Sequence, residues 1–359
     1  MFVAWRDLAF AKGRFALLGA VVALITLLVG FLAGLTVGLG GQSISAIQKL
    51  DAQQFVVSPP GSDGTLSFAD SAISKEQAGK WESAAGVAAV PLGIGQGQAN
   101  RGDSKEAVTV FGTNPGTMAN TPANNGEIVL SETSAIQMNN ASAGQTIVFA
   151  GKTYTVTDVV PDQWYSHLPV TWMTLSDWQS YAETIGQTNP FATVLVVDSA
   201  GNYEAGDNAA ATQSVGGFAT YMAIGSFSSE VGSLLMILSM LVVISAVVIG
   251  AFFTVWIMQR TPDIAVLKAL GSSTKALLVD ALGQALIILV IGVGIGLLIT
   301  TGLGLLVIET AGSAVPFTLS IWTTVAPALI LIVTGLLGAS FALRSVAKAD
   351  PLAALGANR

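Results

Sequence analysis

Few side chains in this sequence have the type and spacing that enzymatic chemistry requires. The chain has no cysteine, which excludes thiolate metal sites, cysteine catalysis and disulfides. The phosphate-binding motif G-x-x-x-x-G-K-[ST] is absent, as are G-x-S-x-G and H-E-x-x-H. His167 is the only histidine, and we interpret it as a surface or packing residue, with metal ligation as the alternative. We therefore expect no catalytic residues.

One polar-edged segment, residues 259–275 (QRTPDIAVLKALGSSTK), lies between two long apolar runs. Thr261 is a candidate N-cap, Pro262 suits the first helical position, and Gly271 favours a helix end. These signals predict a separate helix of about two to three turns, which is too short to be stable alone. Four apolar residues form one arc of this helix: Ile264, Val266, Leu267 and Leu270. An apolar arc on so short a helix predicts docking on a partner.

The composition indicates a membrane protein, because 52% of the 359 residues are hydrophobic and only 10% are charged. Soluble domains are about a quarter charged, and about 20 apolar residues suffice to cross a bilayer. We predict four transmembrane helices, at residues 15–39, 231–259, 276–308 and 322–343. A large domain at 40–230 is inserted between the first two. The remaining segments are an interfacial stretch at 1–14, the short helix at 260–275, an outer loop at 309–321 and a tail at 344–359.

The distribution of basic residues predicts the orientation. Nine of the fifteen lysines and arginines flank the predicted spans on one side, before the first span, between the second and third, and after the fourth. Because positive charge is enriched in short cytoplasmic segments, we expect both termini and the 260–275 segment to be cytoplasmic. The inserted domain is then extracytoplasmic.

The sequence of the inserted domain predicts a mixed α+β fold. Short apolar runs separated by Gly, Asn and Pro predict strands, and Ser74 precedes a helical pattern as a candidate cap. Residues 201–217 are small and polar, so we expect a flexible return towards the membrane. The overall prediction is an α-helical membrane protein with four spans and an extracytoplasmic α+β domain.

The segment between the second and third spans resembles a motif of FtsX/MacB-type (type VII) ABC transporter permeases, close to R-x-x-E-I-A-x-L-K-A-L-G-A-S. Here Asp263 replaces the glutamate and Ser272 replaces the last alanine. The tail RSVAKADPLAAL resembles the family's ending, and residues 126–160 resemble its small β-rich outer subdomain. The opening stretch FAKGRFALLGAVVALITLLVG and the size of the insert are most similar to the haem-exporting HrtB branch.

This resemblance implies a homodimeric efflux permease, embedded in membrane lipid and driven by a separate subunit that binds and hydrolyses ATP. Motion would pass through the membrane to the outer domain, and no nucleic acid is involved. The short helix would contact the ATPase through six residues, Asp263, Ile264, Val266, Leu267, Lys268 and Leu270.

The resemblance to the HrtB branch further implies haem as the transported molecule, with no intrinsic cofactor and no metal other than haem iron. Four residues near the outer end of the second span are candidate haem contacts: Tyr221, Met222, Glu230 and Met236. Glu230 is the first choice, because an acidic group at the edge of an apolar span is costly without a role. A solvated glutamate at a helix end and methionines that only pack are the ordinary alternatives.

Two other functions fit the same family resemblance. One is a transducer like the cell-division FtsX proteins, which regulate an outer cell-wall hydrolase and carry no substrate. The large insert disfavours it, because those proteins usually carry a smaller one. The other is lipoprotein or peptide export, for which the sequence contains no accessory segments.

Overall fold

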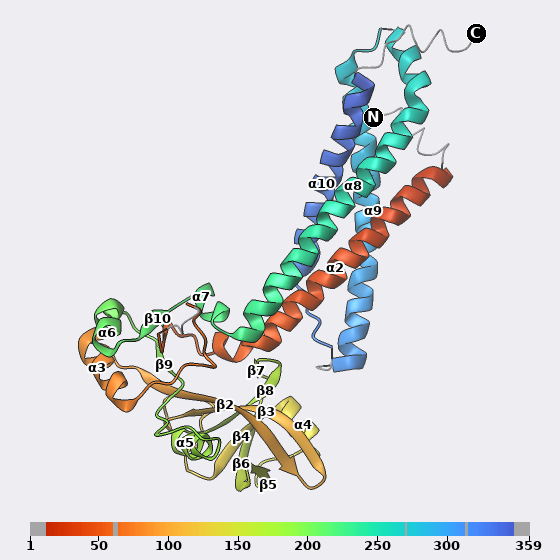
Figure 1. Ribbon diagram of the computed structural model, residues 1–359. Coiled ribbons are helices and arrows are strands. Elements are labelled where there is room, and N and C mark those ends of the chain that lie inside the picture. The colour runs from red at the N-terminus through yellow and green to blue at the C-terminus, as the bar shows by residue number, and fades with distance from the viewer. Residues whose placement is uncertain (1–11, 60–63, 270, 313–314, 348–359) are drawn as a thin grey trace. The chain divides into compact units, whose positions relative to one another are not determined.

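The computed structural model describes residues 12–59, 64–269, 271–312 and 315–347 of the chain (Figure 1). The predicted segments 1–14 and 344–359 therefore lie largely outside the described residues. The chain divides into two compact units, which are described separately below. One unit holds the long helices, and the other comprises Leu39–Gly232.

The helical unit contains four helices that are long and apolar enough to cross a membrane. They are α2 (Lys12–Gln48), α8 (Gly225–Ala269), α9 (Thr274–Ala311) and α10 (Ile321–Ala347). The mean hydropathy of their most apolar stretches lies between 2.0 and 2.8. The predicted four-helix membrane architecture, with a β-rich domain between the first helix and the later ones, is confirmed.

Glycine allows close approach between these helices. A Cβ atom added to Gly296 of α9 would lie 2.5 Å from the carbonyl oxygen of Ala23 on α2, and one added to Gly338 of α10 would lie 2.8 Å from that of Ala246 on α8. Gly34 of α2 accommodates the ring of Phe317, which also lies 4.8 Å from the ring of Phe31. Small residues thus bring backbones together where lipid offers no hydrophobic driving force.

In the described part of the outer unit, ten strands form one sheet in the order β10-β1-β9-β2-β3-β8-β4-β6-β5, with β7 paired to β8. The strands are β1 (Gln54–Val57), β2 (Val90–Arg101), β3 (Ser104–Thr113), β4 (Glu127–Ser131), β5 (Thr146–Phe149), β6 (Lys152–Val160), β7 (Trp164–Tyr165), β8 (Leu168–Thr174), β9 (Val194–Val197) and β10 (Gln213–Val215). Because β2 also pairs with β5, the strands from β2 to β5 along this order close into a ring. Strands β9, β1 and β10 extend from the first half of β2.

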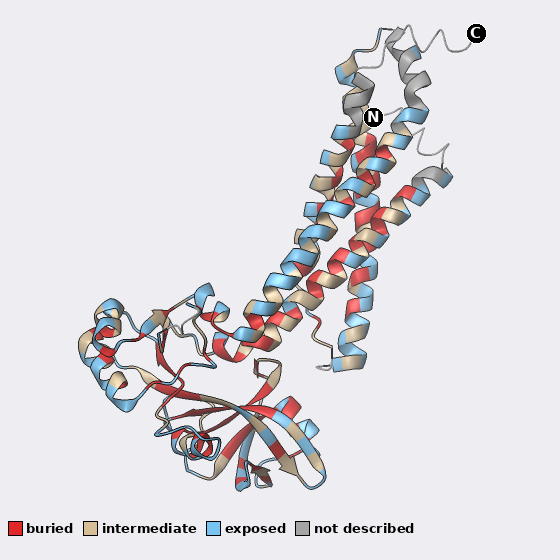
Figure 2. Ribbon diagram, viewed as in Figure 1, coloured by how far each residue is buried: buried red, intermediate tan, exposed pale blue. Residues whose placement is uncertain are grey.

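Five helices complete the outer unit: α3 (Lys75–Ala85), α4 (Glu132–Gln137), α5 (Leu175–Thr184), α6 (Tyr203–Ala210) and α7 (Phe218–Met222). Ser74 caps α3 in a capping box with Gln77, as the sequence predicts. Many residues in the strands of the ring are buried (red in Figure 2), and Trp178 and Tyr181 of α5 belong to the same core. The mixed α+β prediction is correct.

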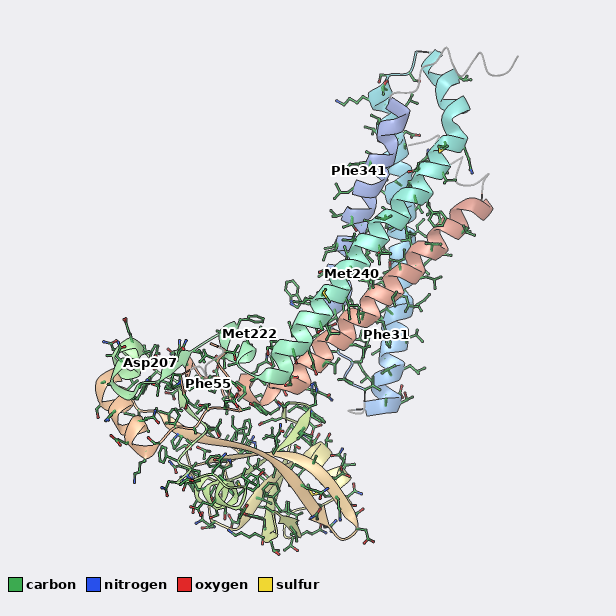
Figure 3. All side chains as sticks on the ribbon, in the orientation of Figure 1. Phe31, Phe55, Asp207, Met222, Met240 and Phe341 are labelled. Atoms are coloured by element: carbon green, nitrogen blue, oxygen red, sulfur yellow. The ribbon has the colours of Figure 1, made fainter. Side chains whose placement is uncertain are left out.

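The prediction of a flexible return at residues 201–217 is wrong. This segment forms helix α6 and strand β10, and β10 pairs with β1. Asp207 of α6 (Figure 3) holds the two elements together, because its carboxylate accepts hydrogen bonds from the Trp81 indole at 3.0 Å and the Ser214 amide at 2.7 Å. Small polar residues are therefore ordered here by tertiary hydrogen bonds that local propensity does not reveal.

Asp177, near the start of α5, is the best-connected buried carboxylate of the ring. Asp177 is 1% exposed. Its carboxylate accepts a hydrogen bond from the Gly126 amide at 2.6 Å and forms an ion pair with Lys152. We expect Asp177→Ala to lower the free energy of unfolding by about 2–3 kcal/mol, chiefly because the partly buried Gly126 N–H loses its acceptor. The half-exposed Lys152 adds little, since water screens it.

This prediction can be checked by denaturant unfolding of the detergent-solubilised full-length protein, followed by tryptophan fluorescence. The exposed Asp198 provides a control, since Asp198→Ala removes the same charge without a buried partner. Equal unfolding midpoints for the two variants would contradict the structural role of Asp177.

Candidate functional site

The candidate site is built around the turn between β7 and β8. Tyr165 and Leu168 pair across this hairpin, which leaves Ser166 and His167 as its two turn residues. Both have left-handed backbones, with φ of 49° and 64°, as a type I′ hairpin turn requires. Because neither residue is glycine, the turn is strained and must be held by its surroundings. Burial raises the pKa of the neighbouring Tyr165 phenol, so this side chain stays protonated at neutral pH.

The turn is held by the last part of α2. The Ser166 amide donates to the carbonyl oxygen of Ser43 at 3.1 Å, and the His167 amide donates to that of Gln42 at 3.0 Å. Further back on the hairpin, the Trp164 amide donates to Ser45 Oγ at 2.9 Å. These bonds fix the hairpin against α2 within the outer unit.

The side chains of the turn also reach the first turns of α8. His167 Nε2 lies 2.6 Å from Glu230 Oε1 and 3.1 Å from Ser43 Oγ. Ser166 Oγ lies 3.1 Å from Ser226 Oγ. The cluster Ser43–His167–Glu230 thus gathers one side chain each from α2, the hairpin and α8. About a third of the His167 and Glu230 side chains is exposed.

This cluster has a different geometry from a serine-hydrolase triad. In a triad, the serine and the acid contact opposite nitrogens of the imidazole. Here Ser43 and Glu230 both contact Nε2, so the histidine cannot relay a proton between them. The second carboxylate oxygen, Glu230 Oε2, is buried and has no hydrogen-bond partner among the described residues. An unsatisfied carboxylate oxygen is a candidate ligand atom for a cation, since leaving it unpaired is costly.

The other three predicted contact residues lie in different environments. Tyr221 packs on the core of the outer unit, with its ring 6.1 Å from that of Phe227. Met222 is 42% exposed on α7 (Figure 3), and Met236 is 62% exposed, six residues or about 1.7 turns beyond Glu230 on α8. Of the four, only Glu230 is shown in a polar cluster.

Sequence reasoning missed the contact between His167 and Glu230. The signals that could have drawn attention to the histidine are its uniqueness in the chain and its place between two strand-like aromatic runs. Its partner Glu230 is 63 positions away, so no local pattern links the two residues.

The predicted separate helix at 260–275 is corrected by the structure. Helix α8 continues without a break from Gly225 to Ala269, so Thr261 does not cap a new helix. The reason is that extending an existing helix is far easier than nucleating a short one. The end of the helix near Gly271 is as predicted, since Gly271 has φ of 97°. Ser273 then caps α9 through the Ala276 amide at 3.2 Å.

Of the six predicted ATPase contacts, only the Val266 side chain is described, and it is 51% exposed. Leu270 lies outside the described residues. The remaining four side chains also lie outside the described part of the chain: Asp263, Ile264, Leu267 and Lys268.

Comparisons with known proteins identify the relatives of this chain. Residues 216–351 match the family described as FtsX-like permease C-terminal. Over 99% of both chains, the sequence is 26% identical to a protein of Staphylococcus haemolyticus and to one of Staphylococcus epidermidis, each named for hemin transport as permease protein HrtB. The predicted resemblance to FtsX/MacB-type permeases of the HrtB branch is confirmed, and the chain is similar over its full length to membrane permeases of this kind.

Two solved structures are similar to part of the chain. The extracellular domain of the ABC-type transporter YknZ from Gram-positive bacteria shares 15% identity, covers 42% of this chain and 84% of its own, and has a TM-score of 0.32. The periplasmic region of MacB from Actinobacillus actinomycetemcomitans shares 14% identity, covers 41% of this chain and 75% of its own, and has the same TM-score.

Proposed function

We propose that this chain is the permease subunit of an efflux transporter that exports haem. The observation that carries the proposal is the full-length similarity to permeases named for hemin transport, joined to a glutamate with a buried, unsatisfied oxygen. Haem iron accepts axial ligands from protein side chains, and a carboxylate oxygen without a competing hydrogen bond is suited to this role. The protein then contributes to haem detoxification.

Glu230 is the proposed iron contact, through Oε2. Tyr221, Met222 and Met236 are proposed as further haem contacts, on the grounds of their apolar or sulfur-bearing side chains near the same helix start. The aromatic pair Tyr221–Phe227 supports this assignment, because a flat porphyrin packs well against aromatic rings.

We propose a homodimer. Helix α8 is the least buried of the four long helices, with 11% of its most apolar stretch buried against 28–39% for the others. Exposed apolar residues run along this helix (Figure 2), including Met240 and Val247. Such a surface is compatible with a second copy of the chain, with membrane lipid at its margins.

Energy is proposed to come from a separate ATPase subunit that binds the end of α8, residues 260–269, and the turn that follows to residue 275. The basic residues that flank the spans support a cytoplasmic position for this end and for both termini, with the outer unit outside. We propose that a displacement of the end of α8 by the ATPase passes along this helix, whose backbone is helical from Gly225 to Ala269.

The haem proposal is tested with the purified full-length permease in detergent micelles. We expect added ferric haemin to give a saturable Soret band, and we expect Glu230→Gln to weaken binding at least about tenfold and to shift the band, because the amide is a far poorer iron ligand. Haemin resistance of a sensitive bacterial strain that expresses the permease with its ATPase should fall in parallel.

The control is Glu309→Gln, which alters an exposed carboxylate at the end of α9 and should leave binding unchanged. Failure of the wild-type permease to bind haemin would refute the assignment of haem as substrate. Equal weakening by both variants would show that Glu230 has no special role.

A further inference from the structure

We propose that His167 is a positioning residue that holds the Glu230 carboxylate in its ligand-ready orientation. The inference rests on the proposed haem function and assigns a residue that supports it. The contact is direct, since Nε2 lies 2.6 Å from Oε1. An imidazole nitrogen that donates to one carboxylate oxygen leaves the other free, and here the other oxygen is the buried, unpartnered Oε2.

The imidazole is itself held firmly. Its residue occupies a left-handed turn position, and its amide is bonded to the Gln42 carbonyl oxygen at 3.0 Å. The preceding residue is bonded to α2 through its amide and lies against α8 through the Ser166–Ser226 hydroxyl contact. A turn strained at two non-glycine residues persists only where the surroundings determine it, and this turn is fixed on both sides.

The side chains around His167 indicate which nitrogen of its imidazole carries the proton. Glu230 can only accept a hydrogen bond when ionised, so the imidazole carries its proton on Nε2. Ser43 Oγ, 3.1 Å from the same nitrogen, contacts the imidazole from the α2 side. The histidine thus determines which oxygen of Glu230 is free, while the hairpin determines where the histidine lies.

Partners that orient a metal-binding side chain typically change metal affinity by about 10–100-fold when they are removed. We therefore expect His167→Phe, which keeps a ring but has no N–H group, to weaken haemin binding within this range. His167→Gln places an amide N–H near the position of Nε2, and it should recover most of the loss.

The experiment measures haemin titrations and ferric electron paramagnetic resonance spectra of the full-length wild type, His167→Phe, His167→Gln and Glu230→Gln. Gel filtration and thermal unfolding establish that each variant is folded. The expected pattern is an altered ferric signal in His167→Phe, a near-wild-type signal in His167→Gln, and loss of the carboxylate-ligated signal in Glu230→Gln.

Three results would overturn the inference, and they are distinguishable. Wild-type affinity and spectrum in His167→Phe, with loss in Glu230→Gln, would remove the positioning role and leave the haem function standing. Equal damage in His167→Gln and His167→Phe would mean that the imidazole is itself an iron ligand. Absence of haemin binding in the wild type would remove the inference together with the haem function.

Discussion

Replacing Leu267 by aspartate is expected to abolish co-purification of the proposed ATPase subunit with this chain. Leu267 lies in the last turns of α8, whose backbone is helical to Ala269. Its place in the sequence pattern puts it at the centre of the apolar arc of residues 264, 266, 267 and 270. A charge at the centre of a buried apolar contact must be desolvated without a partner, which costs several kcal/mol and exceeds what a small interface tolerates.

The matched control is Ala265→Asp, which introduces the same charge in the same turn. Two residues of helix separate the positions by about 160° around the axis, so Ala265 faces away from the arc. Both variants should insert into the membrane normally, and only Leu267→Asp should lose the ATPase in affinity purification. Retention of the ATPase by Leu267→Asp would show that this end of α8 is not the docking site.

The continuity of α8 shows where local signals mislead. Thr261 and Pro262 are typical of a helix start, and a free peptide of this sequence would begin there. In the protein, the apolar helix before them is already formed, so adding residues costs little and the chain continues to Ala269. Gly271 stops the helix as predicted, because its left-handed backbone with φ of 97° favours glycine over residues with a Cβ atom.

Of the two central residues of the candidate site, Glu230 could be predicted from the sequence and His167 could not. Glu230 stands out because a carboxylate borders an apolar run, which is a property of adjacent residues in the sequence. His167 does not stand out, since its meaning comes from a hairpin turn that folds back onto Gln42 and Ser43. Contacts across more than a hundred positions depend on the register of the whole sheet, which short-range patterns do not specify.

Strand β2 shows a related limit of short-range patterns. Residues 93–97 contain three glycines, which in isolation predict a loop. In the structure they form a strand because α5 lies directly against it: a Cβ atom at Gly93 would lie 2.0 Å from the Trp178 ring, and one at Gly95 would lie 2.6 Å from the Tyr181 ring. The glycines provide space for side chains more than eighty positions away.

Removal of the Trp178 side chain is expected to cause a large loss of stability in the outer unit. Trp178 is 2% exposed and belongs to the core of the ring, with β2 and β3 glycines against its ring and Cβ atom. Its indole N–H has no hydrogen-bond partner in the described part of the chain, so we attribute its contribution to packing. Trp178→Ala should lower the free energy of unfolding by about 3–5 kcal/mol, because the flat glycine surface cannot collapse to fill the cavity.

A double-mutant cycle with Gly93 tests that explanation. Gly93→Val alone should destabilise by about 1–3 kcal/mol or more, because its Cβ atom would overlap the Trp178 ring. In the Trp178→Ala background the valine enters the space that the indole leaves. The double variant should therefore lose clearly less free energy of unfolding than the sum of the losses of the two single variants. Ile185→Ala, at an exposed position just after α5, serves as the control and should change stability by about 0.5 kcal/mol or less. If the two losses are additive, Gly93 does not serve to make room for the Trp178 ring.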